Sequence, residues 1–153
     1  MGYQSFPDPY ASRNRNINEG FRVGLIGGIV SALMHLLLPL FSGGAVWGEL
    51  LAWLIQWLLY LLVARSAAQR QYDKQQLQIN PLDGVIGAGV GAALITSILT
   101  WLFILIRAVV IKATGDFVIV EPISLYCIVV LDVLVALGLG GVGGRSVANK
   151  YRL

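Results

Sequence analysis

The sequence predicts an all-α integral membrane protein: four transmembrane helices forming two tandem, duplicated helical hairpins, with both termini cytoplasmic. Composition is the first reason, because 57% of the 153 residues are hydrophobic and only 12% are charged. Soluble domains carry roughly 25% charged residues. The second reason is a set of four long apolar stretches, and the third is an internal repeat.

The apolar stretches run approximately over residues 21–41, 45–64, 85–111 and 118–142. Each reaches the ~20 residues that a helix needs to cross a ~30 Å hydrocarbon core. Lipid offers no partner for open backbone groups, so each stretch is expected to be helical. The stretches lack the alternation of apolar and polar residues that barrel strands need.

The Lys and Arg residues sort by membrane side. All except Arg107 and Lys112 lie around the start of the first span, between the second and third spans, or after the fourth. Cations in short loops favour the cytoplasmic side. We therefore expect a multi-pass protein of the cell inner membrane, in contact with the lipid bilayer. The net charge of +3 is explained by this sorting and does not indicate nucleic-acid binding.

Residues 1–20 are expected to form a polar cytoplasmic tail. Its prolines and polar residues predict that residues 1–16 are not helical and do not fold alone. The tail lacks the features of a cleavable signal, so the first span is interpreted as a signal anchor. The aromatic residues expected to dock this tail on a partner are Tyr3, Phe6 and Tyr10.

The first hairpin covers residues 21–64. Asn16 is expected to cap its first helix, with Glu19 at the third helical position, where a carboxylate meets free amides. Small residues then recur at every fourth position and share one helix face, so a neighbouring backbone can approach closely. They are Gly20, Gly24 and Gly28.

A polar, Gln-rich connector follows at residues 65–83, expected to extend the second helix and then to be solvated. The second hairpin, residues 84–145, begins like the first, with Asn80 as cap, Pro81 at the first helical position and Asp83 at the third. A basic tail, residues 146–153, ends the chain. The small residues expected to pack in this hairpin are Gly84, Ala88, Ala92, Ala136, Gly140 and Gly144.

The two hairpins repeat each other. A shift of 64 residues lays "NINEGFRVGLIGG" over "NPLDGVIGAGVGA", and a shift of 80 lays Arg65-Ser66 over Arg145-Ser146 and Tyr72 near Tyr151. This indicates duplication with a pseudo-twofold axis along the membrane normal. The 16 extra residues of the second hairpin belong to an outer segment, 107–122, which either lengthens the spans or builds a loop at 113–116 that functions in recognition.

Ionisable residues at membrane depth are default candidates for function. Asp132 lies near the bilayer middle, and Gln56 and Thr100 lie at similar depth. One interpretation is a proton or cation site. The other is a structural, hydrogen-bonded carboxyl that faces a neighbouring subunit.

His35 is the only histidine, and it could ligate a haem or pigment metal or donate a hydrogen bond to Glu49. Trp53, Trp57 and Tyr60 form a stripe on the second span that could contact a pigment, quinone or lipid, or pack on another helix. Trp47 and Trp101 are expected near the outer interface. Arg107 is expected to pair with Glu121 or to extend to the headgroups.

No nucleophile lies beside a base and no set of metal ligands is present, so the sequence does not indicate an enzyme. A lone Cys127 excludes disulfide and multi-cysteine metal frameworks within the chain. No cofactor is required by the sequence.

The first functional hypothesis is a non-catalytic accessory subunit of a larger, energy-converting or other membrane complex. It would dock on other subunits through the Gly/Ala faces, the aromatic stripe and the tail. The second is a small homo-oligomeric proton-coupled transporter or channel that uses Asp132 or Glu49. The pattern is broadly similar to that of many short prokaryotic membrane proteins built of Gly-rich tandem hairpins.

Overall fold

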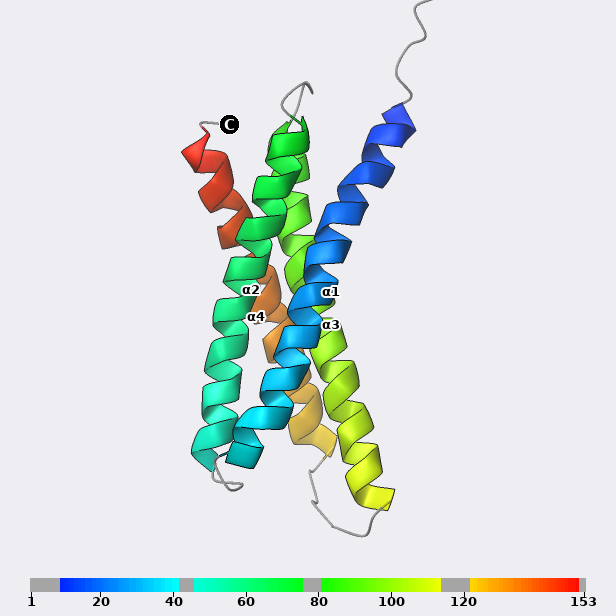
Figure 1. Cartoon of the computed structure of the whole chain (residues 1–153), viewed down its shortest axis with the longest axis vertical. Helices are drawn as coiled ribbons and strands as arrows, with labels where there is room; N and C mark the ends of the chain where they lie inside the picture. Colours follow the sequence, from blue (N-terminus) through cyan, green and yellow to red (C-terminus); the bar gives the residue numbers. More distant parts are fainter. Residues whose placement is uncertain (1–8, 42–45, 76–80, 114–121, 152–153) are drawn as a thin grey trace, which may run out of the picture.

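The chain forms four long helices (Figure 1). The structure, a computed structural model, describes residues 9–41, 46–75, 81–113 and 122–151. The helices are α1 (Pro9–Phe41), α2 (Val46–Gln75), α3 (Pro81–Ala113) and α4 (Pro122–Lys150). Each contains a segment long and apolar enough to cross a membrane. The prediction of an all-helical chain with four potential membrane spans is therefore confirmed.

The helices run alternately up and down, so the beginning of α1 and the end of α4 lie at the same end of the bundle (Figure 1). Helices α2 and α3 pack against each other, and α1 and α4 each pack against both of them. Within the described ranges, α1 and α4 do not contact each other. Helices α2 and α3 therefore form the centre of the molecule.

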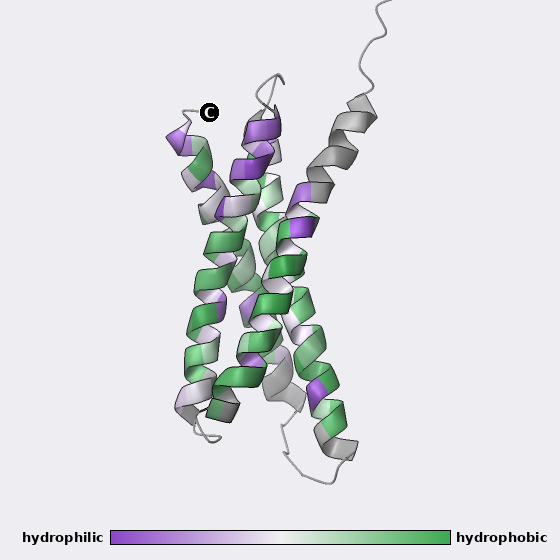
Figure 2. Cartoon of the chain, viewed as in Figure 1, coloured by the Kyte–Doolittle hydropathy of each residue, from purple (hydrophilic) through white to green (hydrophobic). Residues whose placement is uncertain are grey.

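Large apolar side chains lie on the outside of this bundle. Ile26, Leu58 and Leu102 are each more than half exposed, and apolar residues dominate the middle of every helix (Figure 2). The interior consists mainly of alanines, valines and polar residues, together with Tyr60 and Trp101. Lipid tails are as apolar as leucine, so close packing of small residues and hydrogen bonds hold membrane helices together. The distribution matches a chain surrounded by lipid.

Small residues bring α1 against α3. A Cβ atom built on Gly20 would lie 3.0 Å from the Ala88 carbonyl oxygen, and one built on Gly24 would lie 2.8 Å from that of Ala92. At Gly28, the added carbon would lie 2.6 Å from a leucine side chain of α3. This face of α1 is therefore used inside the chain.

Helix α4 approaches α3 in the same way. A Cβ on Gly140 would lie 2.9 Å from Val90 Cα, and one on Gly144 would lie 2.8 Å from Ile86 Cα. Gly89 of α3, which the sequence analysis did not single out, lies at this crossing, with the Gly140 oxygen 3.0 Å from its added Cβ. The remaining residues predicted to pack are Gly84, which is half-buried, and Ala136, which is fully buried.

The prediction that residues 1–16 are not helical is wrong for residues 9–16, because α1 begins at Pro9. Once a span is helical, each further residue adds a hydrogen bond at little cost, and a proline is tolerated in the first turn. Asn16 is therefore inside α1 and not its cap. Tyr10 also lies in α1, whereas Tyr3 and Phe6 lie outside the described residues.

The second hairpin begins as predicted, with Pro81 as the first residue of α3 and Asp83 in its first turn. Helix α3 extends about two turns further beyond Asn80 than α1 does beyond Asn16. Part of the extra outer segment thus lengthens a helix. The rest of the proposed loop, residues 114–121, lies outside the described residues.

Candidate functional site

A cluster of buried polar residues joins all four helices in the middle of the bundle. Each of its members has at most 7% of its surface exposed. The members of this polar cluster are His35 from α1, Gln56 and Tyr60 from α2, Ser97 and Trp101 from α3, and Asp132 from α4.

The carboxyl group of Asp132 is the acceptor at the centre of the cluster. Its Oδ2 atom accepts hydrogen bonds from the Tyr60 hydroxyl at 2.7 Å and the Ser97 hydroxyl at 2.7 Å. Trp101 Nε1 donates to the same oxygen at 2.9 Å. Gln56 Nε2 lies 3.3 Å from both carboxyl oxygens. A buried carboxyl is costly without partners, and here its partners come from two neighbouring helices of the same chain.

The orientation of the side chains follows from this acceptor. Because Asp132 accepts, the amide nitrogen of Gln56 faces it, which leaves Gln56 Oε1 to accept from His35 Nε2 at 2.5 Å. The Tyr60 hydroxyl accepts from Gln56 and donates to Asp132. The imidazole proton is thus assigned to Nε2 by the network. Donors point in one direction, from His35 through Gln56 and Tyr60 to Asp132.

Arg107 contacts the same region through the backbone. Its Nη1 atom donates to the His35 carbonyl oxygen at 2.9 Å. In a helix this carbonyl would accept from the N–H four residues later, but that residue is Pro39, which has no N–H. Arg107 therefore supplies the donor that the proline removes. Glu121, its proposed partner, lies outside the described residues.

The stripe of Trp53, Trp57 and Tyr60 on α2 packs within the bundle, with Tyr60 fully buried and the two tryptophans partly buried. The Trp53 ring meets the His35 ring edge-on, with centroids 5.3 Å apart, and lies 5.6 Å from Trp101. Trp57 packs against the apolar cluster that contains Tyr60. Trp101 is buried among the helices, whereas Trp47 is 79% exposed. Their positions near the outer interface stay a prediction.

No family model, curated protein or solved structure matches this chain. The functional interpretation therefore rests on the residues and their contacts. Within the described ranges, no three His, Cys, Asp or Glu residues are grouped to hold a metal ion. A haem or pigment metal at His35 Nε2 would have to displace the hydrogen bond to Gln56.

Of the two residues expected at the depth of Asp132, Gln56 hydrogen-bonds to its carboxyl group, whereas the Thr100 hydroxyl has a different partner. The Thr100 hydroxyl donates to the backbone of Thr96 at 2.8 Å. Position along the membrane gives depth but not the direction in which a side chain points. The side chain of Glu49 lies outside the described residues.

The sequence analysis missed Ser97 and Trp101 as partners of Asp132. The sequence does contain a relevant pattern, because Ser97 and Trp101 continue the four-residue spacing of Gly89 and Ala93. These four residues therefore share one face of α3. That face packs against α4 at Gly89. Once Gly89 is known to face α4, this spacing places Ser97 and Trp101 on the side of α3 that faces Asp132.

Proposed function

We propose that the chain is a non-catalytic accessory subunit of a larger membrane complex, in the cell inner membrane with both termini cytoplasmic. The observation that carries the proposal is the saturation of Asp132 by donors of its own chain. A carboxylate that couples transport must be reached from water and change partners. Asp132 is 2% exposed and held by four side chains. Its supported role is to fix the helices in one arrangement.

The surfaces available for docking differ from those suggested by the sequence. The Gly/Ala faces around Gly24 and Gly140 are occupied by α3, and Trp53 and Tyr60 are turned inward. Association with other subunits would therefore use the outer apolar surface, which is also the surface in contact with lipid. No pigment, haem or quinone is part of the proposal.

Two contacts support duplication of the hairpin. A Cβ on Gly143 would lie 2.8 Å from Ala64 Cβ. The separation of these two residues in the sequence is one less than the predicted shift of 80. Tyr72 and Tyr151 stack with centroids 3.8 Å apart and an interplanar angle of 14°. Contacts between matching residues are expected near a twofold axis. A twofold axis that exchanges the hairpins would relate the α2–α3 contact to a contact between α4 and α1. Helices α1 and α4 do not touch within the described ranges, so the bundle departs from that symmetry.

The second candidate function is proton-coupled transport or a channel in a homo-oligomer. The buried Asp132 carboxyl favours it, because a carboxyl group hydrogen-bonded to a hydroxyl can take up and release a proton. This function requires that Asp132 be needed for ion movement and not only for stability.

The replacement Asp132→Asn separates the two functions. It exchanges two acceptor oxygens for one and places an amide N–H among donors, so we expect a lower melting temperature of the purified protein. In liposomes with an imposed pH gradient, the accessory function predicts that wild-type protein gives no proton flux above empty liposomes. Flux through the wild type that Asp132→Asn abolishes, with exposed Asp83→Asn as the matched control, would instead establish transport.

A further inference from the structure

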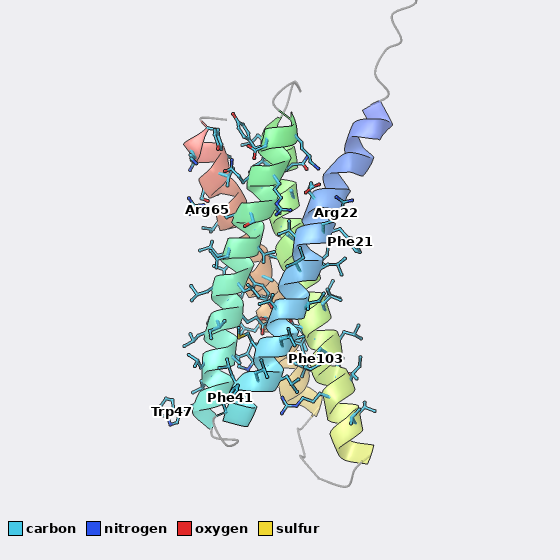
Figure 3. All side chains as sticks on the ribbon, viewed as in Figure 1. Phe21, Arg22, Phe41, Trp47, Arg65 and Phe103 are labelled. Atoms are coloured by element: carbon cyan, nitrogen blue, oxygen red, sulfur yellow. The ribbon has the colours of Figure 1, made fainter. Side chains whose placement is uncertain are left out.

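A second group of charged residues lines a cavity of about 360 Å³ between α1 and α2, at the end of the bundle that carries most of the cations. The cavity is widely open rather than enclosed. Arg22 lies on α1 near this end, next to the half-exposed Phe21 (Figure 3). The lining residues of this charged cavity are Glu19, Arg22, Arg70, Asp73 and Lys74.

The charges in the cavity are already partly paired. Glu19 is 4% exposed and forms an ion pair with Lys74. The partner of this carboxylate is therefore a lysine of α2, and not the free amides of a helix start that the sequence suggested. Arg22 and Arg70 form no ion pair with a carboxylate among the described residues. Asp73 is exposed and accepts a hydrogen bond from Gln69 at 3.2 Å. Two guanidinium groups and one carboxylate are therefore available to a ligand.

An apolar track continues from the cavity toward the middle of the bundle. Ile26 lies one helical turn from Arg22 and is 59% exposed. Leu62 lies two turns from Arg70 and is 60% exposed. Val23 and Val63, which belong to one buried cluster, hold α1 and α2 together behind this track. A ligand with a charged head and long apolar chains matches the surface.

We propose that the charged cavity binds a phospholipid whose headgroup carries both a phosphate and a primary ammonium. The phosphate would lie between Arg22 and Arg70, because guanidinium groups match phosphate geometry. The ammonium would lie at Asp73, and the acyl chains would follow Ile26 and Leu62. A phosphoglycerol headgroup has hydroxyls but no cation to pair with Asp73, and one with a quaternary ammonium has no N–H to donate to it.

The test is lipid binding by the full chain in detergent, measured by native mass spectrometry and by thermal stabilisation. The probes are phosphatidylethanolamine, phosphatidylglycerol and phosphatidylcholine with identical acyl chains, and soluble glycerophosphoethanolamine. We expect phosphatidylethanolamine to bind most tightly and the soluble headgroup not to compete. Arg22→Gln and Arg70→Gln are each expected to weaken its binding about fivefold, as for a partly exposed ion pair.

Asp73→Asn provides the sharper result, because it is expected to remove the preference for phosphatidylethanolamine over phosphatidylglycerol without removing binding. Arg65→Gln, an exposed cation at the same end but outside the cavity, is the control and should change nothing (Figure 3). Equal binding of the three lipids, or an unchanged preference in Asp73→Asn, would overturn the proposal. If soluble glycerophosphoethanolamine bound as tightly as phosphatidylethanolamine, the assignment of the ligand as a lipid would be wrong.

Discussion

At the scale of single residues, Pro39 and Arg107 depend on each other. The proline leaves the His35 carbonyl without its helical donor, and the arginine of α3 replaces that donor at 2.9 Å. Arg107 is half-buried on an apolar helix, where a cation is costly without a partner, so the proline provides a physical reason for its presence. The pair also ties α1 to α3 beside the polar cluster.

This dependence gives the first prediction. Arg107→Met should destabilise the purified protein by about 1–3 kcal/mol, the cost of an unsatisfied buried acceptor. Pro39→Ala restores the N–H, so the double variant should recover most of that loss in thermal unfolding. Additive losses in the double-mutant cycle would show that Arg107 acts in another way.

The donors around Asp132 give the second prediction. Trp101→Phe removes one hydrogen bond and keeps most of the aromatic surface, so the expected loss is small, about 0.6–1.7 kcal/mol. Asp132→Leu should cost more, because it leaves the four donors without their acceptor. Unfolding in detergent measures both variants, and an equal loss would contradict the central position of Asp132.

At the scale of helices, close contacts depend on which face carries the small residue. The glycines facing α3 have no room for a side chain, whereas a Cβ on Gly91 or Gly138 would meet nothing within 4 Å. Sequence spacing alone does not distinguish these faces, because Gly87 and Gly91 also lie four residues apart yet point outward.

The third prediction compares the two kinds of glycine. Gly24→Leu and Gly144→Leu should each destabilise the bundle by about 1–3 kcal/mol or more through overpacking. Gly91→Leu on α3 and Gly138→Leu on α4 are the matched controls and should leave the melting temperature nearly unchanged. Equal effects at inward and outward positions would mean that α1 and α4 are not packed on α3 as described.

Helices were the easiest feature to predict from the sequence, because each apolar run is long enough to cross the hydrocarbon core of a bilayer. Their ends were harder. Pro81 marks the start of α3 correctly, but α1 continues past Asn16 to Pro9 because propagation of an existing helix overrides a weak capping signal. Because α1 begins earlier than predicted, Glu19 lies inside the helix. Its partner is Lys74 on α2 and not a backbone amide at a helix start.

At the scale of the whole molecule, polar and small residues fill the inside and large apolar residues cover the outside. The sequence predicts the number of potential spans and brings Asp132 and Gln56 to the same level of the bundle, because both follow from counting along the chain. It does not predict that Ser97 and Trp101 meet Asp132, because that depends on how α3 is rotated against α4. Helix rotation is set by packing between distant segments.

The central claim is that the chain is a folded unit that works by association with other subunits. The most direct measurement is gentle extraction from native membranes, recording the mass, subunit list and visible absorption spectrum of the purified particle. The account predicts a particle larger than the 16.6 kDa chain that contains other subunits in fixed ratio. A colourless homo-oligomer without other subunits would contradict the account and make Asp132 the first residue to test for transport.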